Sequence, residues 1–243
     1  MMRIKLTILL ILFGITLNSY SEEKIQKKST ISMGVDLASM YLWRGFDLGN
    51  GPAIQPWGEF SYKNFAFGSW GSYELTGTFK EVDLYAKYTH KDFSLLFTDL
   101  FFPGFEGLNQ NYFNFKNQTT GHCAELGLSF NGSEKVPLSI YGGFILYGVA
   151  HDSGSVNTGK VNHSPYLEVK YLGTLNDCAY NIFAGFTPVK STLYQTDGPA
   201  VFNFGLGAQK SVKVTPDFTF PVKLTLGSNP VIGKIYLAVI ISL

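Results

Sequence analysis

The chain has 243 residues with 19 basic and 18 acidic side chains, so it lacks the clustered basic excess that marks a nucleic-acid-binding protein. Aromatic residues make up 16% of the chain and glycine occupies 26 positions, which is above the average of roughly 7% for glycine. The length allows either two small domains or one large β domain, because all-β barrels of this size commonly form single units.

Residues 1–21 read as a secretory signal peptide. Arg3 and Lys5 form its charged start, an apolar core follows, and a small-residue cleavage site ends at Ser21. The apolar core has about 12 residues, fewer than the ~20 that a membrane-spanning helix needs. We therefore expect export with cleavage near Ser21, followed by a flexible lead-in over 22–29.

Short alternating segments recur through the rest of the chain. No apolar run approaches ~20 residues and no i, i+3, i+4 pattern is sustained, so helical membrane spans and helical domains have little support. Segments with a period of two, separated by Gly, Asn, Asp, Ser and Pro, indicate strands. Twelve strands are predicted, at 30–44, 53–63, 65–74, 80–90, 92–102, 121–131, 137–149, 164–172, 178–188, 200–210, 217–227 and 231–243.

The connections between these strands alternate between long and short. The long ones are 45–52, 75–79, 103–120, 150–163 and 188–199, and the short ones are 64, 91, 132–136, 173–177 and 211–216. Outer-membrane barrels have long external loops, short periplasmic turns and an even number of strands. A sheet in lipid must also close, because unpaired edge groups find no water there. The sequence therefore predicts a closed antiparallel transmembrane β-barrel of about 12 strands over 30–243.

Three prolines lie within predicted strands, where each removes one hydrogen-bond donor of the sheet. Pro56, Pro165 and Pro221 are expected at bulges or at strand starts. The strand parity places Cys123 inward and Cys178 outward, which favours two separate buried thiols over a disulfide.

The four histidines are scattered, and neither they nor the cysteines form a plausible metal set. There is also no G-x-S-x-G nucleophile motif. We expect no metal, no cofactor and no enzymatic activity, although a barrel enzyme stays an alternative because a catalytic triad depends on spatial geometry.

The first predicted strand carries the sharpest site prediction. Its parity directs Tyr41 and Trp43 to the outer lipid interface as girdle residues, and Arg44 to the lumen near the mouth. Arg44 is expected to face Trp57 and Glu59 across the first hairpin, where it would set charge preference at a constriction or form a structural ion pair. The pore-lining candidates are Asp36, Arg44, Gln55, Trp57, Glu59, Lys223 and Lys234; further inward candidates are Glu74, Asp83, Lys87, Glu125, Glu168 and Lys170.

The long connection 103–120 is rich in Asn, Gln and aromatic residues. Its Tyr112, Phe113 and Phe115 could stack on sugar rings or fold inward as a constriction. The alternative is that the loop packs on its own aromatic side chains.

Two motifs near the N-terminus resemble a known family. The sequence YLWRGF at 41–46, followed by QPWGE at 55–59, is similar to the N-terminal segment of the TorF-like porin family, whose members are exported outer-membrane proteins of unassigned substrate. The resemblance covers about a tenth of the chain. It implies an outer-membrane β-barrel with passive transport, and it supplies no catalytic residues.

The leading functional hypothesis is a narrow passive porin for small hydrophilic solutes in the lipid of a bacterial outer membrane. We expect the barrel-assembly machinery to recognise the last strand, although that strand ends in Leu243 rather than in the usual aromatic residue. The first alternative is a structural or adhesin-like barrel without an open pore, which binds ligands through 103–120 and 150–163. A second is a soluble secreted β-sandwich.

Overall fold

The structure is a computed structural model that describes residues 29–77, 79–103, 110–116, 119–148 and 163–243. The predicted signal peptide at 1–21 and residues 22–28 of the predicted lead-in lie outside the described residues. So do His151 and most of the connection 150–163. In the described part of the chain, no helix is long and apolar enough to cross a membrane.

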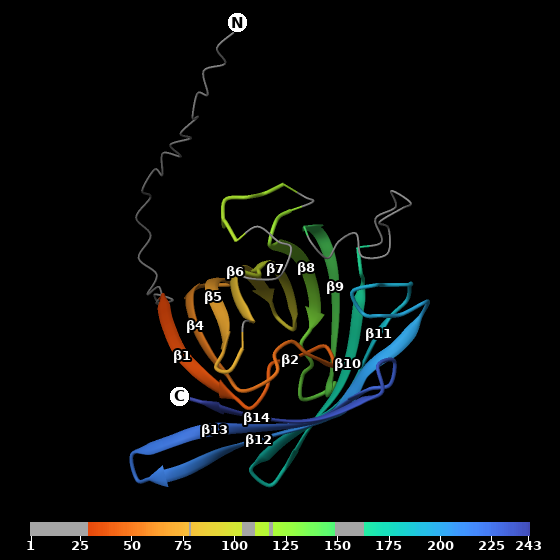
Figure 1. Cartoon of the computed structure of the whole chain (residues 1–243). Helices are drawn as coiled ribbons and strands as arrows, with labels where there is room; N and C mark the ends of the chain where they lie inside the picture. The colour runs from red at the N-terminus through yellow and green to blue at the C-terminus, as the bar shows by residue number, and fades with distance from the viewer. Residues whose placement is uncertain (1–28, 78, 104–109, 117–118, 149–162) are drawn as a thin grey trace, which may run out of the picture.

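Twelve strands close into an antiparallel barrel in which neighbours in sequence are neighbours in space, and β1 closes the ring between β14 and β4 (Figure 1). This confirms the predicted fold class. The barrel strands are β1 (Thr30–Ala38), β4 (Ala53–Tyr62), β5 (Phe65–Glu74), β6 (Lys80–His90), β7 (Phe93–Phe101), β8 (His122–Phe130), β9 (Leu138–Gly148), β10 (Tyr166–Leu175), β11 (Cys178–Thr187), β12 (Ala200–Thr215), β13 (Phe218–Asn229) and β14 (Lys234–Ser242).

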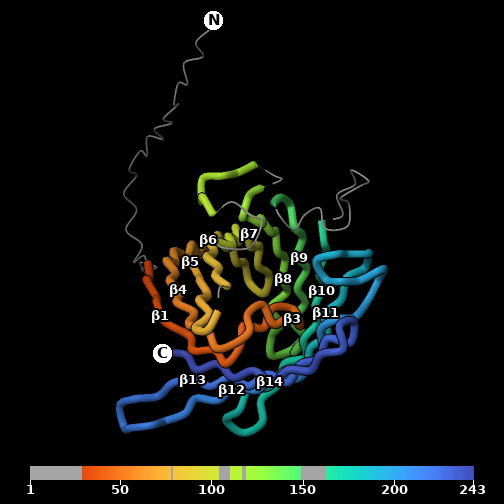
Figure 2. The backbone as a smooth tube through the Cα atoms, in the orientation of Figure 1, coloured from red at the N-terminus to blue at the C-terminus, as the bar shows by residue number. Residues whose placement is uncertain are grey.

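The first strand is shorter than predicted. It ends at Ala38 rather than at Arg44, and the chain then forms a separate hairpin of β2 (Leu42–Trp43) and β3 (Phe46–Asp47) that pairs with no barrel strand. Figure 2 shows this segment inside the ring of strands. The alternating pattern runs on to Trp43 because a hairpin strand has the same period of two as a barrel strand. We call residues 39–52 the inserted hairpin.

Alternation along each strand separates an apolar outer face from a mixed inner face. On β1, Ile31 and Met33 are 72% and 77% exposed on the outer face, and on β12 Phe204 and Leu206 are also exposed. Leu95, Ile140, Val169, Ile182, Leu224 and Leu237 continue this exposed apolar surface over β7, β9, β10, β11, β13 and β14. A contiguous apolar surface of this extent is unusual for a water-soluble protein. The barrel therefore fits an outer-membrane protein.

The connections are sorted by length between the two ends of the barrel. Short turns at 63–64, 91–92, 176–177 and 216–217 lie at one end, together with the connection 131–137. The inserted hairpin and the connections that follow β5, β7, β9, β11 and β13 lie at the other end. The connection after β13, residues 230–233, is short and is the exception at this end. We call these the short-turn end and the long-loop end. The hairpin of β12 and β13 projects past the rest of the barrel at the short-turn end (Figure 1).

Each of the three prolines lies where the sheet does not require its missing donor. Pro165 immediately precedes β10, and Pro56 lies where the ladder between β4 and β5 is interrupted, between Ile54 and Trp57. Pro221 lies one residue before the pairing of β13 with β14 begins. These positions agree with the rule that proline occupies strand starts, edges and irregularities. Cys123 is buried and Cys178 half-buried, and they form no disulfide with each other.

Candidate functional site

The tip of the inserted hairpin presses against the inner wall of the barrel. Arg44 and Gly45 have φ angles of 48° and 77°, so both residues of this two-residue turn are in the left-handed region. The Gly45 carbonyl accepts hydrogen bonds from the Asn229 amide, at 3.2 Å, and from the Tyr236 hydroxyl. A Cβ atom at Gly45 would lie only 3.0 Å from the Phe202 carbonyl oxygen, and the positive φ angle would strain any other residue, so the tip favours glycine. The hairpin is thereby docked on β13 and β14.

Arg44 extends from this tip to the opposite wall. Its Nη2 lies 2.7 Å from the Glu125 carboxylate of β8, and its Nη1 donates to the Tyr194 hydroxyl at 2.7 Å. The guanidinium also lies between two aromatic rings, 4.6 Å from the Trp43 centroid and 4.4 Å from that of Tyr166. Planarity, several donors and weak hydration make arginine the side chain suited to such a buried fork. Arg44 thus ties the hairpin to β8 and β10.

Small residues make space for the aromatic side chains around Arg44. Tyr141 of β9 donates to Glu125 and lies 3.4 Å from Arg44 Nη2. A Cβ atom at Gly127 would lie 2.7 Å from the Tyr141 hydroxyl oxygen, and one at Gly143 would lie 2.9 Å from it. Glycine at these two lumen-facing positions therefore allows Tyr141 to reach the ion pair.

A second segment, residues 188–199, covers the hairpin at the long-loop end. Its Tyr194 is fully buried and stacks on Phe202 at 4.6 Å, and Phe46 of the hairpin joins the same cluster. Burial raises the pKa of the Tyr194 phenol to about 12, although the charge of Arg44 acts in the opposite direction. The phenol is therefore neutral at physiological pH and accepts the hydrogen bond from Arg44. We call 188–199 the covering loop.

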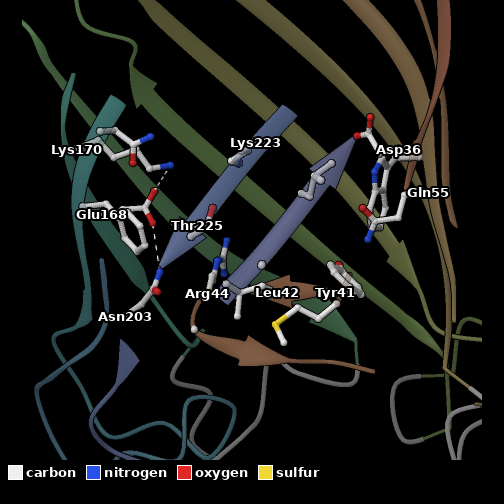
Figure 3. Close-up of a pocket in the computed structure, with 17 residues that line it drawn as sticks. Asp36, Tyr41, Leu42, Arg44, Gln55, Glu168, Lys170, Asn203, Lys223 and Thr225 are labelled. Carbon is white, nitrogen blue, oxygen red and sulfur yellow. Dashed lines mark hydrogen bonds and ion pairs between the residues drawn. The ribbon is translucent and has the colours of Figure 1, made fainter. Parts of the chain in front are cut away.

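A polar cavity of ≈ 380 Å³ remains in the lumen beside the inserted hairpin. Figure 3 shows Glu168 and Lys170 on one side of it, Asp36 and Gln55 on the other, and Lys223 between them. The further lining residues are Met40, Tyr41, Leu42, Arg44, Gly45, Trp70, Asn181, Phe183, Asn203, Thr225, Ala238 and Ile240.

The lining of the cavity contains one ion pair, and two further charged side chains that belong to no ion pair among the described residues. Lys170 Nζ lies 2.7 Å from Glu168, whose other carboxylate oxygen accepts from Tyr166 at 2.6 Å. Lys223 forms no ion pair within 4.0 Å in the described part of the chain, and Asp36 Oδ1 is buried without a hydrogen-bond partner there. The cavity thus presents one charge of each sign without an ion-pair partner within 4.0 Å in the described residues.

The remaining pore-lining candidates lie on the inner face as well. Trp57 lies over Gly34, where a Cβ atom would be 2.8 Å from the indole. Glu59 binds Lys87 at 3.0 Å and accepts from Tyr85 at 2.9 Å, towards the short-turn end. Lys234 begins β14, opposite Asn229. Arg44 is therefore not opposite Trp57 and Glu59 as predicted, because the hairpin turns its side chain to β8, β9 and β10.

The structure also corrects the predicted aromatic girdle. Tyr41 is only 8% exposed and lies in the lumen, with its ring 5.3 Å from that of Trp70. Trp43 packs against the Tyr194 cluster rather than against lipid. Neither residue is part of the barrel wall, because the chain turns into the lumen after Ala38. Tyr194 and Tyr166 belong to no motif of the sequence, and the abundance of tyrosine is the only signal that points to them.

Two acidic side chains are buried beside Tyr41. Glu81 is fully buried, Asp83 is 8% exposed, and neither forms an ion pair within 4.0 Å in the described residues. Burial raises the pKa of the Tyr41 phenol well above its ordinary value, and the neighbouring carboxylates of Glu81 and Asp83 add to this effect. Tyr41 therefore stays neutral next to them.

His122 lies on the outer face of the barrel at the long-loop end. Its Nδ1 is 2.9 Å from the Asp99 carboxylate and its Nε2 is 2.6 Å from the Tyr112 carbonyl oxygen. Phe115 stacks on the imidazole at 4.6 Å. A general base needs the second nitrogen to face a nucleophile, and here a loop carbonyl occupies that position. This pair fastens residues 110–116 to the barrel.

No family model matches the chain, and no curated protein or solved structure matches it either. The resemblance to the TorF-like porin family therefore stays a prediction.

Proposed function

We propose that the chain forms an outer-membrane barrel that acts as a narrow passive channel for small hydrophilic solutes. The observation that carries this proposal is the polar cavity of ≈ 380 Å³ inside a closed barrel whose outer face is apolar. Charged and amide side chains on the inner face suit a water-filled lumen, since rings of such groups control passage through pores.

The inserted hairpin and the covering loop form the constriction of this channel. Twelve-stranded barrels fall between the small barrels filled by their own side chains and the 16–18-stranded porins with open channels. Arg44, Tyr194 and Phe46 fill part of the cross-section at the long-loop end. A solute must pass beside them, so the conductance should be small and the size limit low.

The proposal includes the route by which the protein reaches the membrane. Residues 1–21 act as the cleaved signal peptide, the barrel-assembly machinery recognises β14, and the exposed apolar band contacts lipid. The chain performs no catalysis. The short-turn end then faces the periplasm and the long-loop end faces outward, in the usual orientation of such barrels.

Single-channel recording of the refolded protein in a planar bilayer tests this function. We expect small, stable conductance steps in potassium chloride and faster swelling of liposomes in small sugars than in large ones. A bilayer that stays sealed at every voltage, with correctly folded protein inserted, would remove the channel and leave a structural or adhesive barrel.

Exposed aromatic side chains favour one other function, the binding of surface ligands. Phe113 and Phe115 are 79% and 54% exposed on the loop that His122 fastens. Aromatic rings on a positioned loop can stack on sugars. The double variant Phe113→Ala/Phe115→Ala would abolish glycan binding while preserving the barrel if this function is correct, and unchanged or absent glycan binding would reject it.

A further inference from the structure

We propose that the lumenal cavity is a binding site for a small zwitterion of the amino-acid type, with its anionic group at Lys223 and its cationic group at Asp36. This inference rests on the proposed channel, because the solute must enter the lumen. Its basis is a cavity in which two opposite charges lack partners and do not pair with each other.

Three of the five charged groups that line the cavity are neutralised within the protein. Arg44 is paired with Glu125, and Glu168 with Lys170. In addition, Glu168 accepts hydrogen bonds from the Tyr166 hydroxyl, at 2.6 Å, and from the Asn203 amide, at 3.4 Å. A solute that bound to these groups would have to break their existing ion pairs and hydrogen bonds.

Lys223 and Asp36, in contrast, form no ion pair in the described residues. Lys223 is exposed to the lumen, and the charged groups that act on it are Lys170, which repels it, Glu168, which Lys170 already neutralises, and Asp36. Asp36 attracts Lys223 from beyond the 4.0 Å of an ion pair in the described residues. Asp36 Oδ1 is buried without a hydrogen-bond partner in the described residues. An unsatisfied buried oxygen of a charged group costs more than that of a neutral group, so a hydrogen-bond donor from a solute is strongly favoured there.

The cavity has the size and the polarity for such a solute. Ligand pockets have volumes of roughly 300–1,000 Å³, and this cavity, at ≈ 380 Å³, lies at the small end of that range. The wall also offers hydrogen-bonding groups from Gln55, beside Asp36, and from Thr225, beside Lys223 (Figure 3). Leu42 and Ile240 supply apolar surface. An anion alone would leave Asp36 unsatisfied, and a cation alone would leave Lys223 unsatisfied.

Calorimetry on the refolded full chain in detergent tests the proposal with three probes. L-Glutamine carries both charges, N-acetyl-L-glutamine carries only the carboxylate, and L-glutaminamide carries only the ammonium group. We expect L-glutamine to bind about tenfold or more tightly than either analogue, since a charged hydrogen bond is lost in each case.

Two variants assign the charges to their residues. Asp36→Asn should weaken L-glutamine binding and abolish the preference for L-glutamine over N-acetyl-L-glutamine, but keep the preference over L-glutaminamide. Lys223→Gln should do the reverse: it should abolish the preference over L-glutaminamide and keep the preference over N-acetyl-L-glutamine. A merely structural role would weaken all three probes equally. Asp217→Asn and Lys135→Gln lie in connections of the short-turn end, outside the cavity, and make the same charge changes. Both variants should leave binding unchanged.

The outcomes separate this inference from the channel. A folded protein that conducts ions but binds L-glutamine no better than its analogues overturns the zwitterion site and leaves the channel standing. A protein that binds L-glutamine selectively but never conducts supports the site and overturns passive transport. Equal loss of all three probes in both variants overturns the assignment of charges.

Discussion

Arg44 joins the inserted hairpin to two segments that are distant in sequence, because its guanidinium contacts Tyr194 of the covering loop and Glu125 of the barrel wall at once. Its partner Glu125 is as shielded as Arg44 itself, with 9% side-chain exposure for each. Glu125 Oε2 has no hydrogen-bond partner in the described residues, and Arg44 is the one cation within 4.0 Å of this carboxylate there. Removing one member of a buried pair leaves the other charge uncompensated.

Arg44→Ala should therefore destabilise the barrel by about 3–5 kcal/mol. It should also increase the single-channel conductance, because the hairpin loses its contact with β8 and Tyr194. Denaturant titration followed by gel mobility measures the first effect, and bilayer recording measures the second. Arg44→Lys keeps the charge without the planar fork and should fall between the two proteins. A stable Arg44→Ala protein with unchanged conductance would show that Arg44 does not hold the inserted hairpin against β8 and the covering loop.

Glu81 leads to the opposite expectation for stability. It is fully buried without a cation within 4.0 Å in the described residues, so its charge is a cost to the folded barrel. Glu81→Gln keeps the shape, and its amide can donate to Asp83. We expect a gain of roughly 1–3 kcal/mol in the free energy of unfolding, measured in the same titration. Glu134→Gln on an exposed turn is the control, and a loss of stability in Glu81→Gln would show that the charge itself is needed.

At the scale of elements, the inserted hairpin is separable from the barrel. Neither β2 nor β3 pairs with a barrel strand, and the ring of twelve strands closes without them. Replacing residues 42–47 by two glycines should therefore preserve the closed barrel and its heat-dependent gel shift. The stability should fall as it does in Arg44→Ala, because Glu125 loses the same partner. The conductance should rise because Trp43, Arg44 and Phe46 leave the lumen.

The same variant carries its own control for folding. If the shortened protein keeps its gel shift but conducts no better than the parent, the hairpin is not the constriction. If the shortened protein loses the gel shift, the hairpin is needed for barrel assembly, and the prediction that the barrel folds without it is wrong. The Arg44→Ala protein provides the comparison in which the hairpin is present but unlatched.

The strands could be predicted well from the sequence, and the hairpin could not. Alternation and turn residues specify β4 to β14 because each outer face is apolar, and the loop sorting follows from the same pattern. For residues 39–47 the pattern is ambiguous, since a period of two is shared by a lipid-facing strand and a lumenal hairpin. The decision depends on long-range contacts such as Arg44 with Glu125 and Gly45 with Asn229.

The lumenal site shows the same limit. Asp36 and Lys223 could be assigned to the inner face by parity alone. Parity does not predict that both residues lack an ion-pair partner, because this depends on how the neighbouring charges pair. Lys170 pairs with Glu168 within its own strand rather than across the lumen. Sequence parity gives the face of a side chain but not its partner.

At the scale of the whole molecule, closure predicts resistance to unfolding in mild detergent. Every barrel strand has a neighbour on both sides, so no complete strand is exposed as an edge, and the apolar outer face requires lipid or detergent rather than water. We expect the protein to require detergent for extraction from membranes. On a gel, an unheated sample should migrate differently from a boiled one, because the closed barrel stays compact. A soluble sandwich would be released without detergent and would show no such shift, and that result would overturn the membrane assignment together with the channel that depends on it.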